Sequence, residues 1–223
     1  MTWSGPGLRF WRRLLGTGLA AVAVLMIGAG TALAKYPEIF NSTEKQSRNL
    51  NAFPKWRGTL SRYFNETSVP EKCAGTTFNK CHLKDWNKFL DRIRHLDRIR
   101  QLEMVNREMN RRRYIIDPRN WGVEDYWASP LQFFRKHGDC EDYAISKFMS
   151  LRALGVPNED MRIVVLQDLN LRIGHAVLVV YLKGKAYILD NQIAMVMKAE
   201  RIRHYKPFYS INETSWWLHR SNS

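Results

Sequence analysis

The sequence of 223 residues is short of acidic side chains, of cysteine and of long apolar runs. Its 21 acidic residues stand against 35 lysines and arginines, so the formal net charge is +14. Such a surplus is compatible with nucleic acid, an anionic membrane or simply a basic surface, and it names no reaction. With 45% hydrophobic and 25% charged residues, the composition excludes a wholly disordered chain, a collagen-like repeat and a polytopic membrane protein.

The first 34 residues have the pattern of an export signal. A positive segment containing Arg12 and Arg13 precedes an apolar stretch over 14–30, and the Ala-Leu-Ala at 32–34 supplies the small-x-small pattern of a cleavage site. The alternative is a retained membrane anchor, for which the apolar stretch is barely long enough. We therefore predict a signal peptide over 1–34 that is cleaved after Ala34, and an exported protein.

Export gives a meaning to the three cysteines. Cys73 and Cys81 are eight residues apart in a loop-like stretch, and an oxidising compartment favours a disulfide between them. Cys140 is then left without a partner. An unpaired thiol in an exported protein is buried filler, an intermolecular link or a working nucleophile, so its neighbours must decide between these roles.

The hydrophobic pattern predicts helices first and strands afterwards. Residues 35–80 are interrupted by prolines and asparagines and predict short helices and loops, whereas apolar residues three or four apart predict one amphipathic helix over 85–111. The other face of that helix is rich in arginine. Because no aromatic-studded groove or binding motif accompanies it, we expect a solvated face and no nucleic-acid partner.

A second helix should run from Cys140 to Leu154 and end at Gly155 and Pro157. Three β-rich runs follow it, over 161–166, 175–182 and 186–189, and the Lys-Gly-Lys at 183–185 predicts a hairpin between the last two. Helices followed by antiparallel strands predict an α+β fold in which a buried helix packs on the sheet.

The residues that carry chemistry lie at the ends of these elements. Cys140 begins the second helix, where backbone N–H groups and the helix dipole favour a thiolate. His175 begins one strand of the hairpin and Asp190 follows the other, so both should lie at one end of the sheet. Each residue taken alone has a structural explanation, but their joint placement has the logic of a catalytic triad. Cys140 would attack a carbonyl, His175 would take and return the proton, and Asp190 would fix the histidine tautomer.

Four sequence blocks resemble those of the bacterial transglutaminase-like cysteine proteinases: WxxP at 127–130, GDCEDYA at 138–144, GHAVL at 174–178 and LDN at 189–191. The resemblance extends over roughly 110–217. It implies a papain-like, transglutaminase-like α+β fold with the triad Cys140, His175 and Asp190. It also implies a helical N-terminal part over 35–112 and a catalytic core over 113–223, together forming one compact domain.

The resemblance implies an activity as well. The family type that fits best is a periplasmic protease that requires calcium and cleaves a large cell-surface adhesin near its N-terminus, between small residues, and so controls biofilm attachment. Its inhibitory partner would be an inner-membrane receptor that senses cyclic di-GMP and sequesters the protease. One departure from the expected pattern is Gln132, where the family leads us to expect a glutamate.

Charge around the cysteine bears on the calcium expectation. Asp139, Glu141 and Asp142 surround a residue that should become a thiolate, and their uncompensated charge would raise the pKa of the thiol. A calcium ion would neutralise them and satisfy their oxygen atoms. Charge alone is equally compatible with ordinary acids of a first helical turn, and the family resemblance favours the metal.

The residues leave open the second oxyanion donor and the type of reaction. The backbone N–H of Cys140 is one natural oxyanion donor, and the second could come from Trp121, Trp127 or Gln132. A transglutaminase-type acyl transferase would use the same triad, because water and an amine attack the same thioester. A protein of another class, a non-enzymatic calcium-binding interaction protein of the periplasm, would keep only the acidic block.

Overall fold

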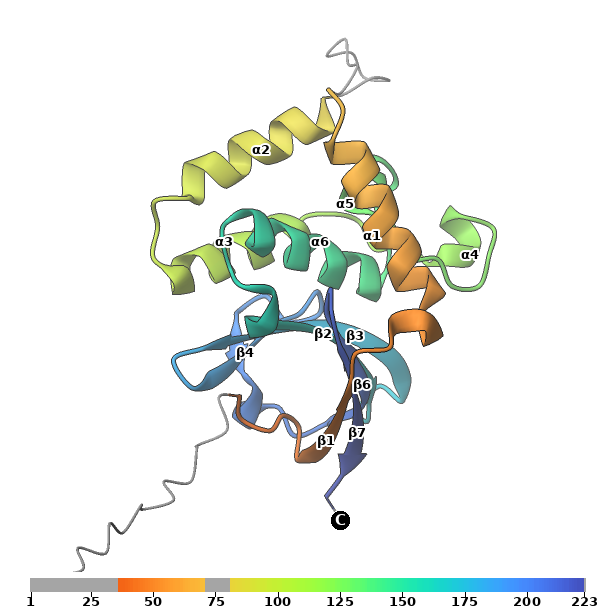
Figure 1. Ribbon diagram of the computed structural model, residues 1–223, viewed down its shortest axis with the longest axis vertical. Helices are drawn as coiled ribbons and strands as arrows, with labels where there is room; N and C mark the ends of the chain where they lie inside the picture. Colours follow the sequence, from red (N-terminus) through yellow and green to blue (C-terminus); the bar gives the residue numbers. More distant parts are fainter. Residues whose placement is uncertain (1–35, 71–80, 223) are drawn as a thin grey trace, which may run out of the picture. The chain divides into compact units, whose positions relative to one another are not determined.

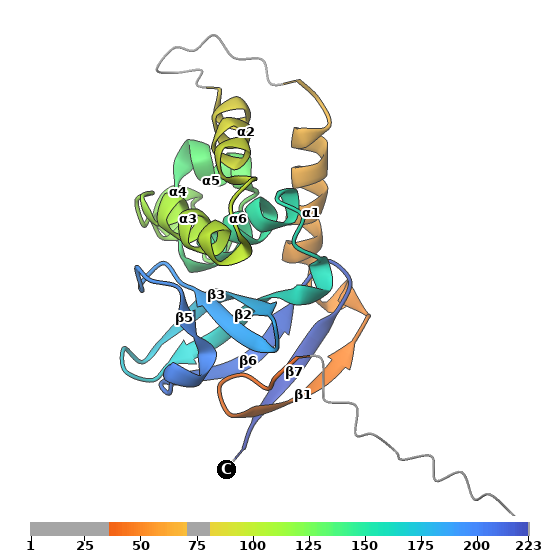
Figure 2. The ribbon, with the colours of Figure 1, turned by 90° about the vertical axis from the view of Figure 1, so that its left-hand side faces the viewer.

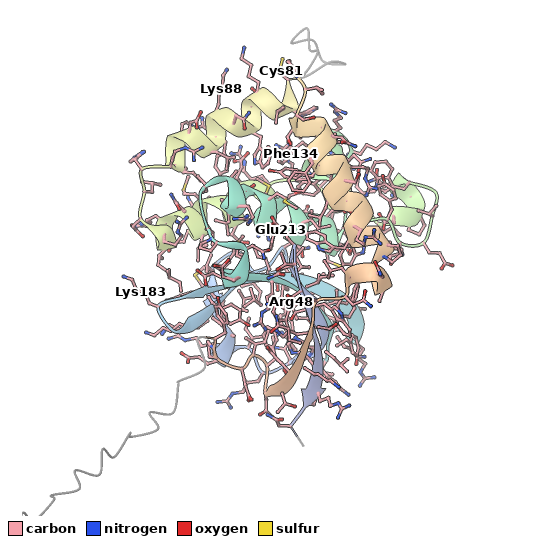
Figure 3. The ribbon with its side chains drawn as sticks, in the orientation of Figure 1. Arg48, Cys81, Lys88, Phe134, Lys183 and Glu213 are labelled. Carbon is pink, nitrogen blue, oxygen red and sulfur yellow. The ribbon has the colours of Figure 1, made fainter. Side chains whose placement is uncertain are left out.

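The computed structural model describes residues 36–70 and 81–222 (Figure 1). The predicted signal peptide and Cys73 lie outside these residues. Within the described part, no helix has both the length and the apolar character needed to cross a membrane. Cys81, which Figure 3 labels, lies directly before the first residue of α2 (His82–Ile93) and is disulfide-bonded, whereas Cys140 is a free thiol.

The helices come before most of the strands along the chain, as predicted. Besides α2 they are α1 (Pro54–Thr67), α3 (Arg98–Asn110), the short α4 (Asp117–Asn120), α5 (Pro130–Lys136) and α6 (Cys140–Ala153). Short 3₁₀ turns lie at η1 (Leu50–Ala52), η2 (Asn158–Asp160) and η3 (Ala199–Arg201).

The strands form one antiparallel sheet of seven in the described part, in the order β1-β7-β6-β2-β3-β4-β5. Their bounds are β1 (Ser42–Ser47), β2 (Met161–Asp168), β3 (Ile173–Leu182), β4 (Lys185–Leu189), β5 (Met197–Lys198), β6 (Tyr205–Ile211) and β7 (Trp216–Ser221). The three predicted β-rich runs are therefore confirmed as β2, β3 and β4. Lys183 and Gly184 both have positive φ and make the tight turn of the β3–β4 hairpin; Figure 3 labels Lys183 there.

Helix α6 lies directly on the sheet with helices around it (Figure 1 and Figure 2): it packs on β2 and β3 and also contacts α3 and α5. The central strands are buried on both faces, which explains why their sequences are continuously apolar. Leu178 and Val180 of β3 belong to the core beneath the helices, while Val177 and Val179 belong to a second core on the opposite face. The predicted packing of a buried helix on an antiparallel sheet is confirmed.

The single helix predicted over 85–111 is wrong, because the chain turns between α2 and α3. The side chain of Asp97 accepts a hydrogen bond from the Arg100 backbone N–H at 3.1 Å and so caps a new helix. Gln101 donates to the backbone oxygens of Ile93 and Arg94, at 3.3 and 3.0 Å, and satisfies carbonyl groups at the end of α2. Polar side chains thus stabilise a break that apolar periodicity does not reveal.

Two further outcomes concern element boundaries. The predicted helix from Cys140 to Leu154 is confirmed as α6, which is followed by a glycine with φ of +84°, Gly155. The prediction of only short helices and loops over 35–80 is wrong, since this stretch contains strand β1 and the 14-residue α1. Strand β1 has a polar sequence and is held by pairing with β7, where Ser42 lies opposite Ser221. Local pattern cannot reveal a strand whose neighbour in the sheet, as far as residues 36–70 and 81–222 show, comes from the other end of the chain.

Candidate active site

The connection between α5 and α6 places Cys140 at the first position of α6. Gly138, two residues before it, lies against the side chain of Asp142. A Cβ atom at Gly138 would stand 2.1 Å from Asp142 Oδ2, so this position accommodates only glycine without rearrangement. The close approach fixes the start of α6 relative to the chain that precedes it.

The thiol of Cys140 is partly enclosed and lies beside strand β3. Its Sγ donates to Glu141 Oε2 at 3.2 Å and is also hydrogen-bonded by the backbone N–H of Ala176. Burial raises the pKa of the Cys140 thiol, the negative charges of Glu141 and Asp139 raise it further, and the Ala176 N–H acts in the opposite direction. The neighbouring carboxylates therefore oppose ionisation of the Cys140 thiol in the folded protein, as expected from the sequence.

His175 and Asp190 form a buried pair at the same end of the sheet, as the hairpin predicts. The distance from His175 Nε2 to Asp190 Oδ1 is 2.9 Å. Because Nε2 is engaged by the carboxylate, the other ring nitrogen, Nδ1, is the one that can accept a proton. Gln192 Nε2 lies 3.5 Å from this Nδ1.

The carboxylate of Asp190 has several donors. The hydroxyl of Tyr205 donates to Oδ2 at 2.5 Å, and the backbone N–H of Gln192 donates to Oδ1 at 2.8 Å. Burial alone would raise the pKa of Asp190, but the hydrogen bonds from His175, Tyr205 and Gln192 outweigh it, and the pKa is lowered. Asp190 is therefore held ionised beside the histidine ring.

The fold brings two of the three predicted residues, His175 and Asp190, into contact, and it places the third, Cys140, beside the residue that follows His175. His175 contacts Asp190 directly, and the residue after His175 contributes the backbone N–H that faces the Cys140 sulfur. The arrangement comes from α6 packing on β3, since Cys140 stands on α6 and His175 on β3.

The predicted metal residues belong to a larger acidic cluster. One group of carboxylates consists of Asp117, Asp139 and Asp142, and a second consists of Asp117, Asp125 and Glu141. Within each group, one oxygen from each residue lies within 4.8 Å of the others. Asp117 is common to both groups, so the cluster gathers around a residue that the sequence had not singled out.

The hydrogen bonding of the cluster suits a hard divalent cation. Three carboxylates each have one oxygen held by a backbone N–H: Asp117 Oδ2 by Tyr126, Asp142 Oδ1 by Ala128 at 2.6 Å and Asp139 Oδ2 by Asp117 at 3.3 Å. The other oxygen of each of the three is buried and has no hydrogen-bond partner among the described residues. Oriented carboxylates with unpaired oxygens are the ligands that calcium takes, and no sulfur or nitrogen ligand of the zinc type stands in either group.

The pKa values of the cluster follow the same logic. Burial raises the pKa of Asp117 to about 6 and that of Glu141 to about 10, and neighbouring carboxylates add to both shifts. The pKa values of Asp139 and Asp142 are also raised, chiefly by burial. These groups resist ionisation together unless a positive charge lies among them.

Two of the candidate oxyanion donors have other contacts. Gln132 completes the capping box of α5 with Ser129, and its Nε2 donates to the Tyr126 hydroxyl at 2.9 Å. The ring of Trp127 packs edge-on against Trp56 in the core. The remaining candidate, Trp121, has a buried indole N–H for which the described residues offer no acceptor.

Sequence reasoning missed Asp117, Asp125, Tyr205 and Gln192. Asp117 precedes a proline and has the pattern of a linker residue, and Tyr205 lies 15 residues beyond Asp190 on a strand that was not predicted. The only signal for Asp117 was an acidic side chain at a helix start, which is a common capping feature.

Comparison with known proteins agrees with these features. Residues 70–221 match the family model described as bacterial transglutaminase-like cysteine proteinase. Legionella pneumophila LapG is 32% identical, with 72% of this chain and 87% of that chain covered and a TM-score of 0.58. Its calcium-bound form is 31% identical (73% and 86% covered, TM-score 0.59) and its EGTA-treated form 32% (74% and 87%, TM-score 0.59). Comparison with curated proteins finds no match.

Proposed function

This chain belongs to the bacterial transglutaminase-like cysteine proteinases, and we propose that it is a periplasmic, calcium-dependent cysteine endopeptidase that cleaves the N-terminal region of a large cell-surface adhesin. The observation that carries the proposal is the buried His175–Asp190 pair together with the free thiol of Cys140, which the backbone N–H of Ala176, the residue after His175, contacts. A structural cysteine would need neither an oriented histidine nor a carboxylate held ionised behind it.

The chemistry follows from this arrangement. The sulfur of Cys140 attacks the scissile carbonyl while Nδ1 of His175 takes the thiol proton. The same nitrogen then gives that proton to the leaving amine as the peptide bond breaks, and a water molecule hydrolyses the thioester. Asp190 holds the Nε2–H tautomer and stabilises the imidazolium. The backbone N–H of Cys140 at the start of α6 is the first oxyanion donor.

Calcium would be held by Asp117, Asp139, Glu141 and Asp142, and when bound it would neutralise the charge that raises the pKa of the thiol. The calcium-bound and EGTA-treated forms of Legionella LapG support this assignment for a relative. The unpaired carboxylate oxygens support it for the present chain.

The substrate, the partner and the compartment rest on the family resemblance. We propose export by the signal peptide over 1–34, cleavage of the adhesin between small residues, release of the adhesin from the cell surface, and control of biofilm attachment. The inhibitory partner would be an inner-membrane receptor that senses cyclic di-GMP and sequesters the protease.

The test uses the exported chain, residues 35–223, with calcium and a purified N-terminal fragment of an adhesin from the same cell. The wild type should cut the fragment once near its N-terminus, and Cys140→Ala should lower the rate by several orders of magnitude because the nucleophile is lost. Equal cleavage by both proteins would refute the proposal. Incorporation of a fluorescent primary amine into the fragment, without hydrolysis, would instead identify an acyl transferase. Calcium-dependent binding without either reaction would identify an interaction protein.

A further inference from the structure

Four aromatic residues line a small pocket near the start of α1, which we call the aromatic pocket. They are Phe53 and Trp56 at the start of that helix, Trp127 in the chain before α5, and Tyr209 of β6. The volume of the pocket is about 240 Å³. Sites for small molecules usually have a volume of about 300–1,000 Å³. The size therefore suits a single large side chain better than a cofactor.

Contacts within the protein hold the walls of the aromatic pocket in place. Phe53 packs against Tyr209 with ring centroids 5.0 Å apart, and Trp56 packs edge-on against Trp127 at 6.2 Å. The indole N–H of Trp56 donates to the backbone oxygen of Asn212 at 2.9 Å, so this polar group of the wall is already satisfied. Because the walls are ordered before anything binds, an apolar side chain that enters would gain burial at a small cost in ordering.

Asp125 connects the aromatic pocket to Cys140. It lines the pocket and forms an ion pair with Lys55, in which both side chains are about half exposed, so this pair stands on the solvent side. One carboxylate oxygen of Asp125 lies within 4.8 Å of an oxygen of Glu141, and Glu141 Oε2 is 3.2 Å from Cys140 Sγ. An extended chain advances about 3.3 Å per residue, so a side chain about two or three residues from the scissile bond can reach the pocket.

We propose that the aromatic pocket is a substrate subsite, which binds one bulky apolar side chain of the polypeptide about two or three residues from the scissile bond. The inference rests on the proposed function and adds specificity to it. Small residues at the scissile bond bury little apolar area and so contribute little binding energy. An apolar neighbour in the aromatic pocket would supply that binding energy and fix the register of the chain. The position beside Cys140 favours the substrate over other occupants.

The first test obstructs the pocket with Ala52→Leu. Ala52 lines the pocket from η1 and is exposed, so a larger side chain there should narrow the pocket without entering the core. We expect kcat/KM for the adhesin fragment to fall at least about tenfold, as for a misfit of about one methylene group in an apolar pocket. The melting temperature should not change. Asn51→Leu adds the same side chain outside the pocket lining and should leave kcat/KM within about twofold.

A cycle of enzyme and substrate variants identifies the side chain that the pocket binds. Mass spectrometry locates the cut in the fragment, and each bulky apolar residue within about three positions of it is changed to alanine in turn. One such change should lower kcat/KM of the wild type at least about tenfold, and on that fragment Ala52→Leu should be within about twofold of the wild type. The same ratio between the two enzymes on every fragment, or a cut with no bulky apolar residue in this range, would overturn the proposal.

Binding without cleavage separates this inference from the protease assignment. Cys140→Ala should bind the intact fragment, and adding Ala52→Leu should raise the dissociation constant at least about tenfold. That result would support the aromatic pocket even if the wild type cleaved nothing, in which case only the proposed function would fail. Cleavage by the wild type at a rate that Ala52→Leu leaves unchanged would refute the subsite alone. A wild-type dimer that Ala52→Leu dissociates, with unchanged cleavage, would show that a second copy of the chain fills the pocket instead.

Discussion

Carboxylates are buried in two regions of the molecule, the His175–Asp190 pair and the acidic cluster near the start of α6, and their hydrogen bonding differs between the two. Behind the histidine, both oxygens of Asp190 have protein donors and the pKa of the group is lowered. At the start of α6, Asp117, Asp139 and Asp142 each keep a buried oxygen without a partner in the described residues, and their pKa values are raised. The protein's own groups therefore satisfy the Asp190 carboxylate, whereas we propose that a cation from solution satisfies the acidic cluster.

This difference indicates which part of the site should depend on the cations in solution and which should depend on folding alone. The His175–Asp190 pair needs only correct folding, because the donors to Asp190 belong to the chain. In the proposed function the acidic cluster would need a cation, because its charges oppose one another and oppose the thiolate. Catalysis would then require both regions, and each could be disabled separately.

The largest effect should come from His175→Ala, which removes the proposed base from the His175–Asp190 pair. The rate of cleavage of the adhesin fragment should fall by several orders of magnitude, while circular dichroism shows an intact fold. His204→Ala is the matched control, since His204 also faces a carboxylate, that of Asp168, at 3.9 Å. It should leave the rate within about threefold, and equal loss in both variants would contradict the triad.

Removal of calcium should be nearly as severe, because it disables the region that depends on solution. Exhaustive chelation should stop cleavage, and calcium should restore it better than magnesium, which demands a tighter octahedron. The double variant Asp139→Ala with Glu141→Ala should stay inactive at any calcium concentration.

Asp117→Asn should need at least about tenfold more calcium than the wild type for half-maximal cleavage. Asp85→Asn on α2 is the control and should behave as the wild type. Full activity after chelation would make these carboxylates ordinary helix-start acids.

Substitutions around the His175–Asp190 pair should lower kcat by amounts that depend on what each one removes. Asp190→Asn should lower kcat by less than His175→Ala does, because it disturbs the tautomer and orientation and leaves the attacking group in place. Tyr205→Phe removes one of the donors to Asp190 and should lower kcat only a few-fold, with a loss of about 1 kcal/mol in the free energy of unfolding. Steady-state kinetics would test the order, and a Tyr205→Phe effect larger than that of Asp190→Asn would contradict it.

The two regions should also respond to pH with opposite sign. In calcium-free protein the pKa of Asp117 is about 6 against a reference of 3.8, so the folded state binds the extra proton and this contribution to stability falls as pH rises from about 4 to 6. Asp190 has a lowered pKa, so its contribution is fully present above 3.8 and is lost as pH falls through the lowered value. Melting temperatures of chelated wild type and Asp117→Asn should converge at low pH and separate, to the disadvantage of wild type, toward pH 7. A constant difference would contradict this.

The last prediction concerns the disulfide of Cys81, which lies outside both the His175–Asp190 pair and the acidic cluster, so we expect it to matter least for activity. Protein isolated from the periplasm should contain one free thiol per chain under denaturing, non-reducing conditions, because Cys81 is bonded and Cys140 is free. Three thiols would show that the bridge does not form in the cell, and none would show that Cys140 is modified or linked to another chain.

The local patterns predicted more of the site than of the fold. The glycine and proline after α6, and the Lys-Gly-Lys turn at 183–185, set boundaries that the structure confirms, because such residues act within a few positions of themselves. The hairpin register then brings Asp190 to His175, so this pair follows from two short segments. The break between α2 and α3 was missed, because it depends on the side chains of Asp97 and Gln101 rather than on apolar spacing.

By itself the sequence indicated the family, the cysteine at a helix start and the hairpin that pairs His175 with Asp190, since each is encoded in contiguous residues. Tertiary structure alone decided the rest. It brought Asp117, which lies 22 residues before Asp139, into the acidic cluster, and it placed Tyr205 behind Asp190. These contacts join residues on separate elements, and their proximity depends on how α6 packs against the sheet, which no local periodicity encodes.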